Sequence, residues 1–452
     1  MKIRKTFSWG VLDKVTRLEF ASFFVYFLGQ FPGRVGADAG TAMQLMRDNQ
    51  SSANWTQIYF WFLKLLTFNG SYIAVAAGFG YACFLFSIHY LIRNIWKSSN
   101  SFSLTTYAIV IFSPLVGVYG MTLDHNLQST TGSLILSGLL LKLFRGEQTT
   151  RADGLLFVFA LVLSSMSIIG IVTLLGFFLV LLLIRQPIKL VASVTIIAVS
   201  IVLVGHLLPV TPRSTGFKYI TVLSDIRCLL SNENVKISQA DLANLENFGP
   251  LNSWKDPVSC VIPDSGEFAR LTITSENEKL IRDVWLRLFR DNPRYILLAH
   301  LQRSSVALPP GLSGPQPNAY ETDLLLPLGT NTPRWLHVWD GVVDDSRYQT
   351  EEIQPQPAVL KYAQYLIIFP SIILNYNSHI WGWGGLWLLI SSIILFRNWG
   401  RKGILLLVPV MVSHAFLFLM IPTPNSRYTY LSITLGLLLL SVRKKPTVFR
   451  SW

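Results

Sequence analysis

The chain has 452 residues, of which 51% are hydrophobic and 14% are charged, and its formal net charge is +13. Apolar runs close to the ~20 residues that cross a bilayer recur along it, which argues against a wholly soluble protein. The basic residues fall in short clusters between these runs, a pattern typical of cytoplasmic loops rather than of a nucleic-acid surface. None of the three cysteines belongs to a Cys-x-x-Cys pair, so a zinc or redox motif is not indicated.

Membrane-length segments begin near the N-terminus. A first span is predicted over residues 18–31, with the basic start of the chain inside and the loop Phe31-Pro-Gly-Arg-Val-Gly-Ala-Asp38 outside. Residues 39–68 mix charged and aromatic side chains, which is typical of helices lying in the membrane interface. A second span over residues 71–92 returns inside, and a third, from about residue 102, emerges at Asp124.

The fourth span returns to Arg145 and Arg151 and is followed by a charge-free run of 30 residues, 155–184. This run is too long for one ordinary span, so it predicts two helices that turn near residues 164–167. A further span then runs outward to Pro209. Residues 1–208 are therefore expected to form an N-terminal transmembrane module of about seven spans.

The middle of the chain differs in composition. Residues 209–356 carry 18 of the 25 acidic residues and no membrane-length apolar run, which predicts an extracytoplasmic α-containing domain with its own core. Within it, Ser275-Glu-Asn-Glu278 is typical of a capping box that opens an amphipathic helix, and Pro293 is expected to end that helix and start another. Cys228 and Cys260 both lie in this domain, where an oxidising compartment favours a disulfide between them; two buried thiols are the alternative.

The last part of the chain, residues 357–452, is predicted to hold an interfacial helix over 358–374 and then about three spans. Counting 358–374 as a full span would place Arg397 and Arg401 on the wrong side of the membrane. The Trp381-Gly-Trp-Gly-Gly stretch is predicted to be an interfacial aromatic belt. The whole chain is thus expected to be an all-α polytopic membrane protein of about ten spans with both termini in the cytoplasm.

Few acids belong to the predicted membrane modules. The topology places only Asp38, Asp48 and Asp124 on the outer side of the bundle. A carboxylate at a membrane surface is costly unless it is paired or used, so we expect a chemical role for Asp38 and then for Asp124. The structural alternatives are that Asp38 pairs with Arg34 or caps a helix starting at Ala39, and that Asp124 caps a helix.

Arg427 lies at the outer end of the last span, beside Tyr428. Its guanidinium would either snorkel to the interface or contact a phosphate, and the sequence leaves both alternatives open. The histidines are dispersed and show no i, i+4 pairing of the kind that indicates a metal cage.

Taken together, these motifs resemble the GT-C superfamily of integral-membrane glycosyltransferases. The resemblance rests on the Pro32-Gly33 loop ending at Asp38, a Trp at position 55 in the interfacial helices, and the acid Asp124 after the third span. The stretch from Trp285 to Tyr295 resembles the external helix pair of bacterial cell-surface-polysaccharide members. Ser426-Arg-Tyr428 resembles the Arg-Tyr pair before their final span.

The resemblance implies transfer of a hexose or pentose from a polyprenyl-phosphate donor to a glycan or lipid-linked acceptor outside the bacterial cell membrane. Asp38 would be the general base of an inverting reaction, and Asp124 would orient the acceptor or hold Mg²⁺ or Mn²⁺. The residues expected to bind substrate are Arg34, His125, Tyr295, Arg427 and Tyr428. Should Asp38 not be the base, Asp225 of the external domain is the next candidate.

Two other function classes remain open. A transporter or flippase for lipid-linked sugars is also polytopic and basic, but it is expected to carry ionisable groups or broken helices near the middle of the bilayer. A polysaccharide polymerase or ligase is chemically close to a glycosyltransferase, but it would be expected to present several external arginines to a pyrophosphate.

Overall fold

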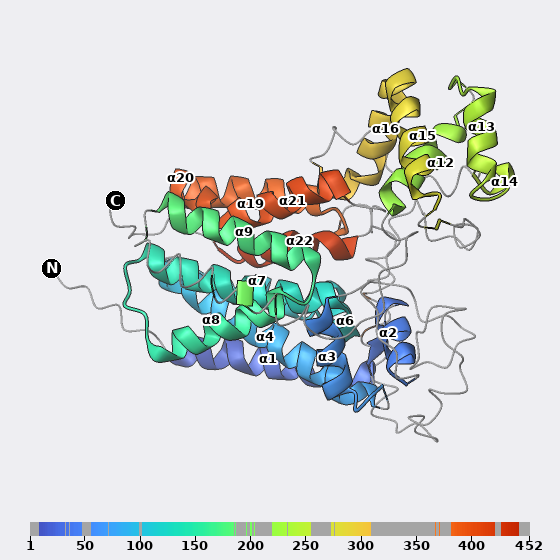
Figure 1. Ribbon diagram of the computed structural model, residues 1–452. Coiled ribbons are helices and arrows are strands. Elements are labelled where there is room, and N and C mark those ends of the chain that lie inside the picture. The colour runs from blue at the N-terminus through green and yellow to red at the C-terminus, as the bar shows by residue number, and fades with distance from the viewer. Residues whose placement is uncertain are drawn as a thin grey trace.

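The computed structural model describes residues 9–31, 33–35, 37–47, 56–70, 72–98, 102–184, 219–232, 234–254, 276–308, 381–420 and 426–442, with residues 186, 196, 199, 200, 203, 273, 274, 367 and 370. Within these ranges the chain is mostly helical, in agreement with the all-α prediction. Figure 1 shows a bundle of helices that lie side by side, with a smaller helical subdomain at one end.

Among the described residues of 9–184, the first part of the bundle holds nine helices and one short pair of strands. They are α1 (Trp9–Gly29), β1 (Arg34–Val35), α2 (Ala37–Arg47), α3 (Gln57–Leu66), α4 (Ile73–Ser98), α5 (Leu104–Ile111), α6 (Pro114–Gly120), β2 (Thr122–Leu123), α7 (His125–Phe144), α8 (Arg151–Ser164) and α9 (Ile168–Leu183).

The C-terminal helices complete the bundle. They are α19 (Gly384–Trp399), α20 (Arg401–Ile404), the 3₁₀ helix η6 (Leu405–Leu407), α21 (Val408–Met420), the 3₁₀ helix η7 (Ser426–Thr429) and α22 (Tyr430–Leu439). The backbone N–H of Ser103 donates to the carbonyl of Ser441 at 2.9 Å, so the end of α22 lies beside the start of α5.

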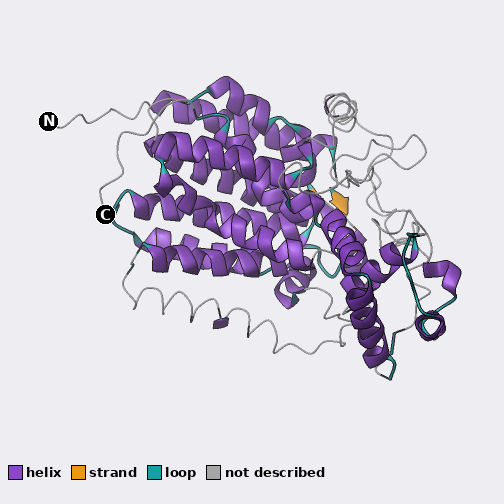
Figure 2. Ribbon diagram, turned by 90° about the horizontal axis from the view of Figure 1, so that it is seen from above, coloured by secondary structure: helices purple, strands orange, loops and turns teal. Residues whose placement is uncertain are grey.

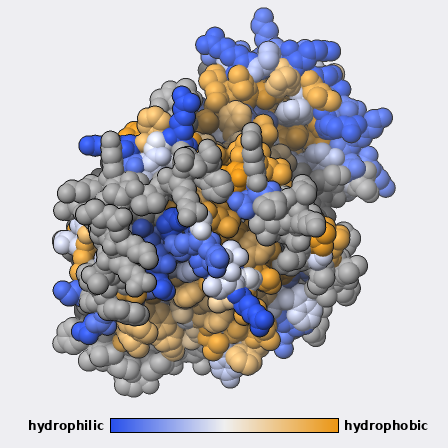
Figure 3. Space-filling model, turned by 90° about the vertical axis from the view of Figure 1, so that its left-hand side faces the viewer, coloured by the Kyte–Doolittle hydropathy of each residue, from blue (hydrophilic) through white to orange (hydrophobic). Residues whose placement is uncertain are grey.

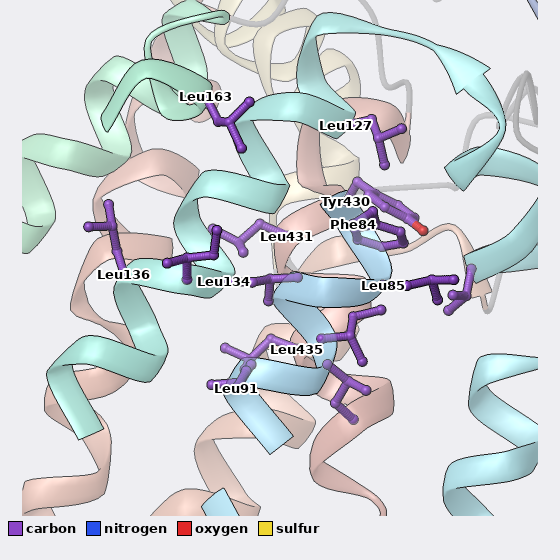
Figure 4. Close-up of a cluster of buried hydrophobic side chains, with 14 of the residues drawn as sticks. Phe84, Leu85, Leu91, Leu127, Leu134, Leu136, Leu163, Tyr430, Leu431 and Leu435 are labelled. Carbon is purple, nitrogen blue, oxygen red and sulfur yellow. The ribbon is translucent and has the colours of Figure 1, made fainter. Parts of the chain in front are cut away.

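Helix α7 lies at the centre of the bundle and packs against α4, α8, α9 and α22. Figure 4 shows leucines of α4, α7 and α22 meeting one another, with the Phe84 and Tyr430 rings in contact in the same cluster, their centroids 5.7 Å apart. Helix α9 runs along α21, and Gly176 makes this contact possible, because an added Cβ would lie 2.4 Å from the Cα of Pro409. Small residues at such contacts let two helices approach closely.

The subdomain consists of α12 (Ile220–Leu230), α13 (Gln239–Glu246), α14 (Leu251–Trp254), α15 (Glu278–Asp291), α16 (Pro293–Arg303) and the 3₁₀ helix η3 (Ser305–Ala307). It has its own apolar core, which includes the fully buried Trp254 and Phe248. In the view of Figure 3 hydrophilic residues gather on the projecting upper lobe formed by this subdomain.

The subdomain is fixed to the bundle by hydrogen bonds. The indole Nε1 of Trp383 donates to the carbonyls of Ser305, at 3.0 Å, and Leu308, at 2.8 Å. His300 Nε2 bonds to the carbonyl of Phe418 in α21. Of the predicted interfacial aromatic stretch, Trp381 is partly exposed and Trp383 is buried, so the Trp383 indole packs inside the protein and the predicted belt is not confirmed.

Several predicted boundaries move. Helix α1 begins at Trp9 rather than near residue 18, and Glu19 is buried in the bundle, where Tyr107 donates to it and His89 Nδ1 lies 2.8 Å from it. The third segment is divided between α5 and α6, because Ser113 caps a new helix that starts at Pro114.

Two helix starts also differ from prediction. Helix α2 begins at Ala37, so Asp38 lies within its first turn and not at the cap of a helix starting at Ala39. Helix α15 begins at Glu278 with Asn277 as its N-cap and no side-chain cap bond, so the capping box predicted from Ser275 is wrong. The predicted hairpin in 155–184 is confirmed: α8 ends at Ser164, and the Ser167 side chain caps α9. Pro293 starts α16 as predicted.

Among the described residues, α4 and α7 are long and apolar enough to cross a membrane, and α9, α19 and the stretch Leu405–Met420 are shorter apolar helices. A count of ten spans is therefore not confirmed. The interfacial helix predicted over 358–374 and the span predicted to reach Pro209 lie largely outside the described residues. Large apolar side chains on the flanks of the bundle are exposed, among them Phe24, Leu175 and Ile393, at 56%, 58% and 58%.

Candidate functional site

The two predicted catalytic acids follow two strands that pair with each other. Strands β1 and β2 are parallel, with Arg34 opposite Thr122 and Val35 opposite Leu123. Asp38 comes three residues after the end of β1 and Asp124 comes directly after β2, so the chain brings both acids to the same edge. Figure 2 shows a strand arrow at the end of the bundle that carries the helical subdomain. The side chains of Arg34 and Asp38 lie outside the described set.

Gly33 allows this pairing. Its φ of +126° is one that residues other than glycine rarely adopt. A Cβ added to Gly33 would also lie 2.4 Å from the Cβ of Ala77 in α4. The loop therefore passes directly over α4 before it enters β1. Of the predicted Pro-Gly motif, Gly33 has a clear backbone role.

Asp124 is the N-cap of α7. Its Oδ1 accepts the backbone N–H of Asn126 at 2.6 Å, and its side chain is 5% exposed. His125 Nδ1 lies 3.9 Å from the same oxygen, and the His125 ring packs against Tyr59 with centroids 5.4 Å apart. Asp124 thus caps a helix, as one of the two predictions for it proposed. Its carboxylate is buried and does not lie on the surface.

A small polar pocket of ≈ 10 Å³ lies between α7, α9, α21 and the start of α22, and Asn126, whose N–H donates to Asp124, lines it. This volume suits about one water molecule. Its polar lining comes from four segments that are far apart in sequence: Asn126, Ser129, Thr130 and Ser133 of α7, Thr173 of α9, Ser413 and His414 of α21, and Arg427, Tyr428, Thr429 and Ser432.

Arg427 is the cation of this pocket. Its guanidinium lies over the ring of Tyr428, 5.1 Å from the centroid, and donates to the Tyr428 hydroxyl at 3.3 Å. Tyr119 of α6 lies within electrostatic range of both Asp124 and Arg427, and its ring contacts Tyr430 with centroids 4.0 Å apart. The structure therefore brings Asp124, His125, Arg427 and Tyr428 to one end of the bundle.

The remaining predicted residues lie elsewhere. Tyr295 packs against the core of the helical subdomain. Cys228 is disulfide-bonded, Cys83 has a free thiol, and Cys260 lies outside the described residues.

Asp225, the alternative base, is buried in the subdomain. Arg303 contacts it at 2.6 Å, and Trp285 Nε1 donates to it at 3.1 Å. Burial raises the pKa of Asp225, while the positive charges of Arg303 and His300 oppose that rise. Its side chain is 5% exposed.

Sequence reasoning missed the polar stripe of α7 and its partner His414. The signal was present, because Asn126, Ser129, Thr130 and Ser133 recur with helical spacing along one face. His414 lies in an apolar run that gives no sign of its polar contacts. Its Nδ1 lies 2.8 Å from the carbonyl oxygen of Ala307, and its Nε2 lies 3.1 Å from the hydroxyl of Ser432.

The described part of the chain contains no set of side chains that could bind the expected Mg²⁺ or Mn²⁺. No group of three or more His, Cys, Asp or Glu side chains suited to a metal ion occurs there. Among the described side chains, His125 is the one potential metal ligand paired with Asp124, whose Oδ1 already accepts a backbone N–H. The residues described here do not fit Mg²⁺ or Mn²⁺, which prefer several oxygen ligands.

Comparison with protein-family models, with curated proteins and with solved structures gave no match. The function of this chain is therefore inferred from its own residues.

Proposed function

We propose that this chain is an integral-membrane glycosyltransferase that moves a sugar from a polyprenyl-phosphate donor to an acceptor outside the cell membrane. The observation that carries the proposal is the parallel pairing of β1 with β2, which sets the Asp38 turn beside Asp124. Arg427 lies at the same end of the bundle. One base, one structural acid and one cation are thus gathered where a lipid-linked phosphate and a hydroxyl acceptor would meet.

The apolar flanks support a membrane location. Exposed Phe20, Phe24, Phe79 and Phe86 form apolar surfaces on α1 and α4 that water would not favour. Basic side chains gather at the opposite end of the bundle from β1 and β2, including Lys97, Arg151 and Arg397. By the positive-inside rule we place that end in the cytoplasm and the helical subdomain outside, in a bundle of about ten spans.

The donor phosphate needs a cation close to the membrane surface. Arg427 suits this role because a guanidinium binds phosphate through two parallel hydrogen bonds, and Tyr428 holds its plane. The polar stripe of α7, from Asn126 to Ser133, lines the same small pocket as Arg427.

Asp38 is the proposed base. It would accept the proton of the acceptor hydroxyl while that oxygen attacks the anomeric carbon and the polyprenyl phosphate departs, so that the configuration inverts. Asp124 is assigned a positioning role, because its Oδ1 caps α7 and its negative charge lies in the neighbourhood of Arg427.

The direct test is a transfer assay with the purified full chain in detergent. The probes are synthetic polyprenyl-phosphate hexoses and pentoses, supplied with envelope glycan fragments as acceptors. We expect a new glycosidic bond with the inverted anomeric configuration, identified by mass spectrometry and NMR. Movement of intact donor across a vesicle membrane without any new glycosidic bond would identify a transporter and overturn the proposal.

A further inference from the structure

A second cavity lies between α7, α8 and α9, along the half of α7 that ends at Phe144. Its volume is ≈ 200 Å³ and its walls are mostly apolar, with Leu140, Leu161, Leu174 and Phe177 buried around it. A ligand pocket of this kind is typically apolar with a few polar groups that fix orientation. Here the polar groups are all at one end.

That polar end is the turn between α7 and α8. Lys142 Nζ lies 2.5 Å from Asp153 Oδ2, and the backbone N–H and hydroxyl of Thr150 donate to the same carboxylate at 2.6 and 2.7 Å. Thr149 and Gly154 also line the cavity and are exposed, and a Cβ added to Gly154 would meet nothing within 4 Å. The cavity is thus closed by leucines at depth and bordered by exposed residues at the turn.

The surroundings of this turn are positively charged. Arg93, Lys97, Lys142, Arg145 and Arg151 are five cations, and Glu147 and Asp153 are the two acids among them. Both acids are already engaged, Glu147 by Arg145 at 2.6 Å and by Lys97 at 3.5 Å, and Asp153 by Lys142. An excess of three positive charges remains to attract an anion.

The ligand of this cavity differs from the proposed sugar donor. Helix α7 has 20 residues, so about 30 Å separates its start beside Asp124 from its end near Lys142. A molecule whose charged group lies at Lys142 cannot present that group to Arg427. Given the membrane orientation of the proposed function, its headgroup would face the cytoplasmic leaflet, which is rich in anionic lipid.

We propose that this cavity binds one acyl chain of an anionic phospholipid whose headgroup lies against the α7–α8 turn. The apolar walls take the chain, and the excess cations take the phosphate. This inference shares with the proposed function only the membrane location, and it does not depend on any sugar transfer.

The test is native mass spectrometry of the purified, delipidated full chain titrated with phosphatidylglycerol or with phosphatidylcholine of identical acyl chains. Wild-type protein should retain one phosphatidylglycerol at least about tenfold more tightly than phosphatidylcholine. Arg151→Gln should weaken phosphatidylglycerol binding about fivefold and leave phosphatidylcholine unchanged, because one exposed cation is lost.

Two further variants separate the cavity from the general surface. Leu174→Trp fills the cavity and Gly154→Phe obstructs its exposed border, so each should abolish the tightly held lipid. Leu155→Trp is the matched control, because Leu155 is 75% exposed and does not line the cavity. Circular dichroism and thermal unfolding establish which variants are folded; if Leu174→Trp is not, Gly154→Phe decides.

Equal retention of the two lipids by the wild type would overturn the proposal. So would unchanged lipid retention in a folded cavity-filling variant, since the lipid would then lie on the outer surface. Cell fractionation tests the membrane location separately, because a chain that is not in the membrane fraction would contradict that location whatever lipid it binds.

Discussion

Asp124 is held by the backbone of the helix that it caps. Its Oδ1 accepts the N–H of Asn126 at 2.6 Å, and this bond satisfies one of the donors left free at the start of α7. Because α7 lies at the centre of the bundle, the cap also fixes the polar residues that follow it. Asp124, which the sequence marks as one of few acids on the outer side, therefore stabilises the start of α7.

Substitution at Asp124 should separate capping from charge. Asparagine is about as good an N-cap as aspartate, whereas alanine costs about 1 kcal/mol of stability. We therefore expect Asp124→Asn to keep the wild-type midpoint of thermal unfolding in detergent and Asp124→Ala to lower it. Equal midpoints for the two variants would show that the cap contributes nothing measurable.

The burial of Glu19 and its bonding partners could not be predicted from the sequence. In the structure Glu19 is buried and bonded to Tyr107 and to His89. These partners lie 88 and 70 residues away, and no local pattern indicates such a pairing. A buried carboxylate needs partners, so its placement followed from tertiary packing alone.

At the scale of elements, the short β1–β2 pair has the greatest influence on the site. It is two residues long, and its position depends on the close passage of Gly33 over α4. Neither strand has the length or alternation that a sequence pattern would reveal. The pairing that joins the Asp38 turn to Asp124 could therefore not be predicted.

Gly33→Ala should disturb this pairing. The new Cβ would lie 2.4 Å from Ala77 and would also force a positive φ on alanine, so we expect a loss of about 1–3 kcal/mol in the free energy of unfolding. Gly154→Ala is the control, because its Cβ would meet nothing within 4 Å and alanine favours a helix. Thermal unfolding of both variants measures the difference; similar midpoints would contradict the role given to Gly33.

Other elements followed from the sequence because their signals are local. The turn between α8 and α9 falls at the predicted serines, since Ser167 caps the second helix, and Pro293 starts α16. The break at Ser113 and Pro114 carries the same kind of signal, but the apolar residues on both sides of it concealed it. The burial of Trp383 could not be predicted, because its bonding partners belong to the distant η3 region.

At the scale of the whole molecule, the subdomain and the bundle meet around α16. His300 bonds Phe418 of the bundle and also lies 2.8 Å from Arg303, which in turn contacts Asp225 and donates to Thr221 at 2.6 Å. Burial lowers the pKa of His300, and the positive charge of Arg303 lowers it further. The docked state therefore favours neutral His300.

This arrangement predicts a pH dependence. The unfolded chain binds a proton at His300 more readily than the folded chain, so the stabilisation is complete above about pH 6.5 and is lost as the pH falls through the lower folded pKa. His300→Gln removes that titration and retains a donor for Phe418. Between about pH 7.5 and about pH 5, the wild-type unfolding midpoint should fall more than that of His300→Gln. Parallel pH profiles would exclude His300 as the titrating group.

The central claim is that Asp38 accepts the proton of the acceptor during sugar transfer, and one substitution tests it. Asp38→Asn keeps the size of the side chain but removes the base, so transfer by purified protein from synthetic polyprenyl-phosphate sugars should fall by about 10²–10⁴-fold. Donor binding and the unfolding midpoint should be unchanged. The control is Asp13→Asn, at an exposed acid in the first half of α1, paired with Arg17 at 2.6 Å, which should transfer as the wild type does. Near wild-type turnover by Asp38→Asn would contradict the account.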